Sequence, residues 1–143
     1  MGAVSISQLV GRVRDQILTL GTLTQLDLAW DVATGSSNAR DLTFAVGVPR
    51  SVALSDRQRS GGTAYTLSTL RVAVWARLKP KASLVTYANA LDVEDTVRKV
   101  VCARADSYPG DCTIRWVESA RSVVGDEWHR LDLTFEVRHH QEN

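Results

Sequence analysis

The sequence predicts an α/β (α+β) fold, in which a mostly antiparallel sheet of about five strands carries two helices packed on one face. Two stretches, residues 68–78 and 129–138, alternate apolar and polar side chains as half-buried strands do. Two others, residues 6–20 and 90–101, repeat apolar residues at three- and four-residue spacing, which is typical of amphipathic helices. The predicted order is helix, two strands, loop, long strand, helix, two strands, and the second face of the sheet is expected to be free.

Length and composition fit one globular domain spanning residues 1–143. The chain has 143 residues, 44% of them hydrophobic and 23% charged, which is enough to build a core. Its formal charge of +1 argues against a dedicated nucleic-acid binder, whose phosphate contacts require a basic excess. The N-terminal residues contain neither a basic segment nor a long apolar run, so no signal peptide or membrane span is expected.

The first helix is expected to begin at Ser5, since Ser5 and Gln8 have the spacing of a capping box. Gly21 stands where a C-cap is expected. The apolar stripe of this helix consists of Ile6, Leu9, Val10, Val13, Ile17 and Leu20.

Two strands should follow. Leu26, Leu28 and Trp30 alternate with polar or small residues, and a second alternation runs over residues 42–48 after a polar loop at 34–41. An antiparallel pair is the default expectation for two strands joined in this way.

Residues 49–64 are predicted to form a projecting loop that is rich in Arg, Ser and Gly, with a few residues of strand at Val52, Ala53 and Leu54 as an alternative. Loops of this length are uncommon in compact domains unless they are functional or disordered. Two interpretations stand: a solvated hairpin tip, or an arm that becomes ordered against a neighbouring subunit.

The long central strand should bury Leu70, Val72 and Val74 and should end before Pro80, which lacks an N–H for the ladder. The helix after it is expected to bury Ala90, Val93, Val97, Val100 and Val101, with Asp92, Asp95 and Lys99 on the opposite side. Glu94 with Arg98 and Asp95 with Lys99 have the spacing of favourable ion pairs.

The last two strands are predicted over residues 113–123 and 129–138. Ile114 and Trp116 fall on one face and Val117 on the other, which indicates a bulge or burial on both sides. Residues 139–143 are interpreted as a tail.

The chemical candidates are weak. His139, His140 and Glu142 invite a metal site, but adjacent residues on a strand diverge, so no metal and no other cofactor is predicted. His129 is interpreted as a structural histidine. Cys102 and Cys112 either bridge across the turn at 106–111 or, as we prefer, remain free thiols. No nucleophile elbow or phosphate loop is present, and Gly61-Gly62 is too short for one, so an enzyme is not expected.

Trp75 and Trp128 fall on the wetter faces of their strands. If these strands are neighbours, the two indoles can form an exposed apolar patch suited to subunit contact. The alternative is that loops or a helix cover them.

The chain resembles the tail terminator and tail-completion proteins of long-tailed bacteriophages. The resemblance depends on the N-terminal helix, the strand Thr69-Leu-Arg-Val-Ala-Val-Trp-Ala-Arg77, the helix Leu91-Asp-Val-Glu-Asp-Thr-Val-Arg-Lys-Val100, and the two closing strands around residues 116–120 and 130–138. Residues 49–64 have no counterpart in it.

The resemblance implies a small structural subunit that closes into a ring, expected to be a hexamer, at the head-proximal end of the tail tube in the virion. Such a ring ends tube polymerisation and offers a docking surface to head-completion or neck proteins. Its partners are copies of itself, the tail tube protein and the neck protein, with DNA only passing through the lumen and no membrane involved. It is made in the host cytoplasm.

We hypothesise that basic residues near the loop and the exit of the central strand take part in these contacts: Arg57, Arg59, Arg77, Lys79 and Lys81. Solvation is the alternative role for them. Two other functions remain open, a head-tail connector of the same particle and a small binding domain without enzymatic activity.

Overall fold

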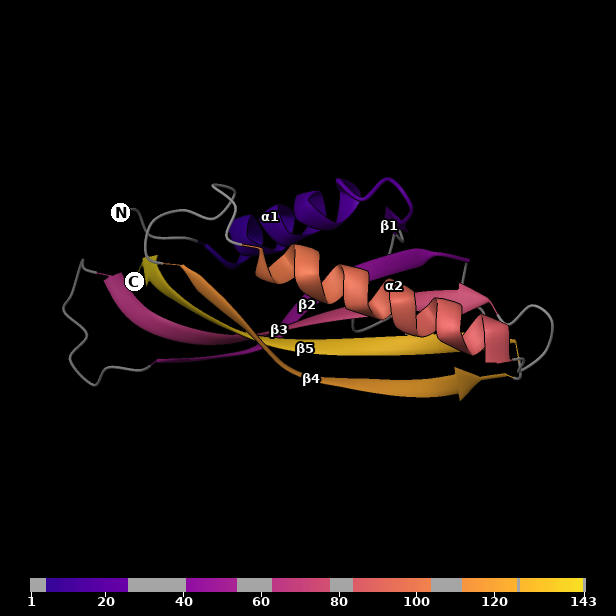
Figure 1. Ribbon diagram of the computed structural model, residues 1–143. Helices are drawn as coiled ribbons and strands as arrows, with labels where there is room; N and C mark the ends of the chain where they lie inside the picture. The colour runs from indigo at the N-terminus through magenta and orange to yellow at the C-terminus, as the bar shows by residue number, and fades with distance from the viewer. Residues whose placement is uncertain are drawn as a thin grey trace.

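The computed structural model contains two α-helices and a five-stranded sheet, and both helices lie on the same face of the sheet (Figure 1). It describes residues 5–25, 41–53, 63–77, 84–103, 112–125 and 127–142. The elements in chain order are α1 (Ile6–Leu18), β1 (Thr24–Gln25), β2 (Thr43–Ala53), β3 (Thr63–Arg77), α2 (Leu84–Cys102), β4 (Thr113–Val124) and β5 (Trp128–Glu142). The predicted fold class is confirmed.

The sheet has the strand order β1-β2-β3-β5-β4. The pairs β2–β3, β3–β5 and β5–β4 are antiparallel, whereas β1 pairs with β2 in parallel. Strand β1 precedes the strand that the sequence predicted at 26–31, so its parallel pairing does not test the antiparallel pair expected for that segment. A parallel pair needs a connection of a dozen residues or more, and the chain from Gln25 to Thr43 is long enough to supply it. The strand predicted at 26–31 lies wholly outside the described residues.

Helix α1 begins as the sequence predicted. The Ser5 hydroxyl accepts a hydrogen bond from the Gln8 N–H at 3.1 Å, and the Gln8 side chain accepts one from the Ser5 N–H at 3.0 Å. The C-cap is Thr19, and Gly21 lies two residues beyond it with a φ of 72°, a conformation that glycine adopts without strain. The start of the helix is thus confirmed, and its end is slightly earlier than expected.

The core lies between the helices and the sheet. The buried α2 residues Ala90, Val97 and Val101 belong to the predicted stripe, and Asp92, Asp95 and Lys99 are exposed as expected. Ala90, Val97 and Val101 pack in one cluster with buried side chains of α1, β3 and β5, namely Leu9, Val13, Ile17, Leu70, Val72, Val74, Leu131, Leu133, Phe135 and Val137. The two helical stripes therefore share one apolar layer on the sheet.

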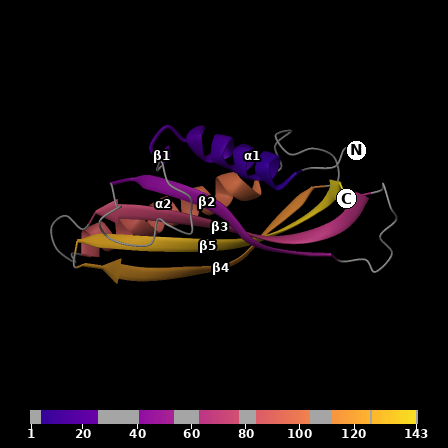
Figure 2. The same ribbon diagram turned by 180° about the vertical axis from the view of Figure 1, so that it is seen from behind.

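Strands β2 and β3 are longer than predicted. Residues 49–53 and 63–64, interpreted as loop from the sequence, continue these strands, and a bulge between Gly47 and Arg50 accommodates Pro49. Residues 54–62 lie outside the described part of the chain. The far ends of β2, β3 and β5 extend past both helices (Figures 1 and 2). We call this part of the sheet the strand extension, and it comprises residues 50–53, 63–68 and 138–142.

Candidate subunit interface

The structure describes three of the seven residues predicted at the interface. Arg57, Arg59, Lys79 and Lys81 lie outside the described residues. Arg77 is exposed at the end of β3, as a contact residue must be. The two remaining candidates, Trp75 and Trp128, are described below.

Trp75 and Trp128 are neighbours, but they form no exposed patch. In the β3–β5 register Trp75 faces Arg130 and Arg77 faces Trp128, and the two indoles form one cluster with Val124 against it. Trp75 is 0% exposed and Trp128 only 8%. Of the two alternatives that the sequence left open, an exposed patch and covered rings, the structure shows covered rings, because alternation along a strand does not determine what covers a face.

An arginine stands over each of these rings. The Arg130 guanidinium carbon is 5.2 Å from the centre of the Trp75 ring, and that of Arg77 is 5.8 Å from the Trp128 ring. Arg130, itself buried, also donates to both carboxylate oxygens of Asp132, the closest contact being 3.0 Å from Nε to Oδ2. The two indoles and the arginines over them therefore form a layer on the helix-free face at this end of the sheet. The expectation that this face is free is wrong there.

Strand β4 is an edge strand with exposed apolar side chains. Within the described residues its only strand partner is β5, and none of its residues is buried (Figure 1). Trp116 is 39% exposed, Val117 41% and Val123 56%. The predicted bulge is confirmed, since the register shifts between Trp116 and Glu118. A long edge with such side chains is a template for pairing with another chain.

The second edge is the outer side of β2. Strand β1 pairs with Thr43 and Phe44 only, so in the described part of the chain the rest of β2 has no strand on that side. Residues 49–53 are exposed, and Val52 is 39% exposed. Both edges of the described sheet thus offer unpaired backbone together with apolar side chains.

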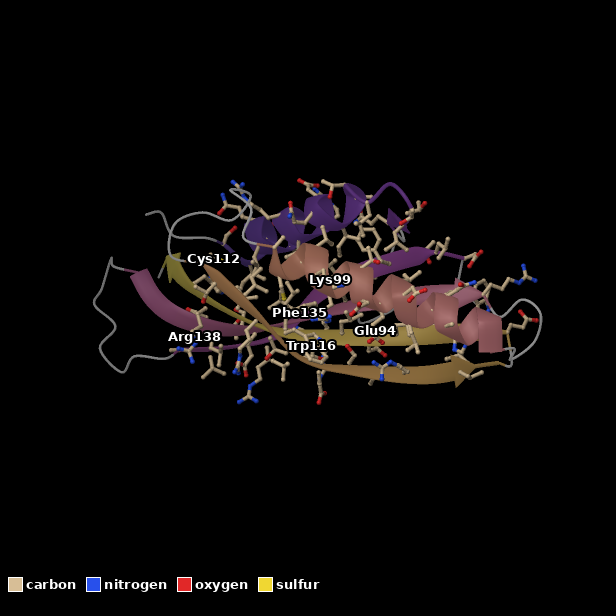
Figure 3. The ribbon with its side chains drawn as sticks, in the orientation of Figure 1. Glu94, Lys99, Cys112, Trp116, Phe135 and Arg138 are labelled. Atoms are coloured by element: carbon tan, nitrogen blue, oxygen red, sulfur yellow. The ribbon has the colours of Figure 1, made fainter. Side chains whose placement is uncertain are left out.

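A partly buried ion pair connects β4 to α2. The Arg121 guanidinium donates to both carboxylate oxygens of Glu94, at 2.7 and 2.6 Å, and the Glu94 side chain is only 8% exposed. Figure 3 shows Glu94 on the side of α2 that faces the sheet. The expected Glu94–Arg98 pair is therefore wrong, because Glu94 points inward to an arginine that lies 27 residues away in sequence.

On the exposed side of α2 the charged side chains form ion pairs with one another. Arg98 contacts Asp95 at 2.6 Å, and Lys99 contacts the same carboxylate at 3.3 Å, which confirms the predicted Asp95–Lys99 pair. Hydrogen bonds from Arg98 and Lys99 lower the pKa of Asp95. These exposed contacts set the local charge pattern and contribute little to folding.

Trp116 is held in place although it is partly exposed. The Arg98 guanidinium carbon lies 5.4 Å from the centre of its ring, and the indole N–H donates to the Ser119 hydroxyl at 3.0 Å. Figure 3 places Trp116 on β4, below α2. The sequence predicted the face of this residue and missed that its strand is the edge.

A chain of hydrogen-bonded polar side chains joins β2, β3 and β5 at the start of the strand extension. The hydroxyls of Ser51 and Ser68 are 2.8 Å apart, and the Ser68 hydroxyl is 2.8 Å from Nε2 of His139. Ser68 and His139 are fully buried, so the tail interpretation of residues 139–142 is wrong: β5 continues to Glu142. A serine hydroxyl at 0% exposure is closed to substrate, so this serine–histidine contact is structural.

The thiols are also buried in part. Cys102 and Cys112 are free, as preferred from the sequence. Burial raises the pKa of Cys112 to about 11, and burial is the largest cause of the raised pKa of Cys102. Thiols of this kind are largely protonated at neutral pH and react slowly.

The structure describes the predicted metal-site candidates only in part. No group of three metal-ligating side chains occurs among the described residues, and the side chains of His140 and Glu142 lie outside them. His129 is buried, as expected of a structural histidine, and burial lowers its pKa.

Two hollows of about 350 and 300 Å³ adjoin each other between α2 and the start of β2. Both are lined by Leu42 and Val93, and Asp41 at the rim accepts a hydrogen bond from the Arg77 N–H at 2.9 Å. Their walls are mostly apolar.

Neither described helix is long and apolar enough to cross a bilayer.

Comparison with known proteins identifies no family. No protein-family model matches the chain, and no curated protein sequence matches it. Among solved structures, a chain from the virion of a native gene transfer agent (GTA) particle is similar over 96% of this chain and 95% of that chain, with 15% identity and a TM-score of 0.47. A similarity at this level identifies neither the family nor the function of the chain.

Proposed function

We propose that the chain is a structural subunit of a phage-like particle, and that it acts as a tail terminator. Copies of it form a ring, expected to be a hexamer, at the head-proximal end of the tail tube in the virion. The ring ends tube polymerisation and receives the head-completion or neck protein. The sequence resemblance to tail terminators supports this role.

The observation that carries the proposal is the pair of open sheet edges. A heterologous contact joins two different surfaces of the same subunit, and it generates a ring when the rotation between subunits closes. The described sheet offers two such surfaces, β4 on one side and the outer part of β2 on the other. The function is recognition without bond chemistry, so no catalytic group is required.

The test is electron microscopy of the purified protein mixed with tail tubes of the particle whose genes encode it. We expect rings at one end of each tube, and tubes that stop growing when the protein is added during polymerisation. Tubes that grow to the same length with and without the protein contradict the proposal. Rings that bind the head portal instead of the tube identify a head-tail connector.

The predicted basic contacts can be tested in the same assay. Replacing Arg57 and Arg59 by alanine should weaken ring or tube association without lowering the melting temperature, and more strongly at low salt, because rim charges mainly set encounter rates. Lys99→Ala, an exposed site on α2, is the matched control. Unchanged association of the double variant removes these two residues from the interface.

A further inference from the structure

Strand β4 lacks several of the features that keep natural edge strands from pairing. Such edges are commonly short, or they carry lysine or proline. Thr113–Val124 is 12 residues long and contains neither residue type. Its bulge at Val117 and its charged residues Arg115, Glu118 and Arg121 are the protective features that remain, and apolar side chains are exposed on both sides of the bulge. This strand is therefore suited to main-chain pairing with a further strand.

The direction of the strands selects a partner for β4. Three successive antiparallel pairings separate β2 from β4 in the sheet, so β2 and β4 run in opposite directions. If β2 of a second copy lies beside β4 in the same sense, the sheet continues with an antiparallel pair. The two strands also match in length, with 11 residues in β2 and 12 in β4.

The charges at the two edges are complementary. Arg50 on β2 and Glu118 on β4 are both exposed, and neither has an ion-pair partner within the described residues. Arg50 is opposite Thr69 in β3, and Glu118 is opposite Thr134, which is itself opposite Arg71. Thr69 and Arg71 lie on the helix-free face, so Arg50 and Glu118 lie on that same face. Each is also the residue that follows the bulge of its strand.

We propose that a second copy of the chain adds the outer edge of its β2, around residues 50–53, to β4 of the first copy in antiparallel register. Arg50 of one copy then pairs with Glu118 of the other, and Val52, on the same face of the sheet as Arg50, lies near the β4 bulge. Closure of this contact into a ring rests on the proposed function, whereas the contact itself needs only two copies. Pro49 lies inside the β2 bulge, so it costs at most one donor outside the paired segment.

Cysteine cross-linking tests the contact and its direction. A chain that carries both Arg50→Cys and Glu118→Cys, treated with a short bis-maleimide, should form covalent multimers beyond the dimer. After cross-linking, each single variant alone should give only covalent monomers. A mixture of the two single variants should give covalent dimers and nothing larger. The wild type measures the background from Cys102 and Cys112. A dimer from Glu118→Cys alone shows β4–β4 pairing and overturns the proposal, as does the absence of multimers from the double variant.

Charge reversal tests the ion pair. Arg50→Glu and Glu118→Arg should each weaken self-association, measured by sedimentation, by about tenfold. The double reversal should restore most of it, and Asp92→Arg on the exposed side of α2 should have no effect. Equal association of all four variants, or a double variant as weak as the singles, refutes the pairing.

The two proposals can fail separately. Multimers through β2 and β4 that ignore tail tubes leave this contact standing and refute the terminator role. Rings that cap tubes but give no cross-link between positions 50 and 118 leave the function standing and refute this contact.

Discussion

The two faces of β3 are both buried, but by different means. On one face Leu70, Val72 and Val74 pack against the helices in an aliphatic layer. On the other, Trp75 is equally buried and lies beneath Arg130, whose charge is held by Asp132. Alternation in a strand therefore determines which residues share a face, and not how much water that face meets.

The helix-covered face should dominate stability. Phe135, fully buried in the aliphatic layer, is the site of largest expected effect: Phe135→Ala should lower the free energy of unfolding by about 3–5 kcal/mol, from lost burial and the cavity left behind. Urea denaturation measures this. Val123→Ala on exposed β4 is the control, and it should change stability by less than about 0.5 kcal/mol. Similar losses for both variants would place the core elsewhere.

Two arginines of β4 allow a matched comparison. Arg121 holds the buried Glu94, whereas Arg115 contacts Glu136 at 2.6 Å with its own side chain 74% exposed. Arg121→Ala should cost about 2–3 kcal/mol, because it leaves a carboxylate buried without its cation. Arg115→Ala should cost about 1 kcal/mol or less. The free energies of unfolding of the two variants check this, and equal values contradict the assigned role of Glu94.

These outcomes also mark how far sequence reasoning reached. The capping box at Ser5 and the stripe of α2 depend on neighbours in sequence, and both were predicted. The bulge at Val117 was one of two alternatives that the sequence left open. The partner of Glu94 depends on which strand lies under α2. The strand order that brings β4 there is set by pairings between residues far apart along the chain.

The same limit explains the errors at the candidate interface. Trp75 was placed on the wetter face of its strand because it alternates with the apolar residues Val74 and Ala76, and Arg130 covers it from another strand. Residues 139–142 were interpreted as a tail because they are polar, yet His139 is buried where Ser68 meets it. Polar residues that satisfy each other across strands leave no apolar signal along the chain.

The helix-free face can be tested at the Trp75 indole. Its N–H is buried and has no acceptor among the residues that the structure describes. Trp75→Phe removes this donor along with some ring area, so the two effects should nearly offset and the change in unfolding free energy should stay within about 1 kcal/mol. Trp128→Phe, at a less buried ring, is the control. A loss of several kcal/mol for Trp75→Phe would show that the indole N–H is satisfied.

The smallest expected effect is a pH dependence from His129. Burial lowers its pKa in the folded state below the ordinary 6.5, so the unfolded state binds the proton more readily. The free energy of unfolding should therefore be undiminished above this value and should fall as the pH is lowered through it. Denaturation curves between about pH 8 and about pH 5 measure this. His129→Gln should reduce the loss, and an unchanged loss assigns it to other groups.

The most direct test of the account is the mass of the assembly, measured by light scattering on the purified protein alone and then with tail tubes. The account predicts one discrete mass, six times that of the chain, formed alone or on the tube end. A dimer that does not grow further indicates that like edges have paired with each other, which contradicts head-to-tail assembly. A chain that stays monomeric and does not bind tubes contradicts the central claim.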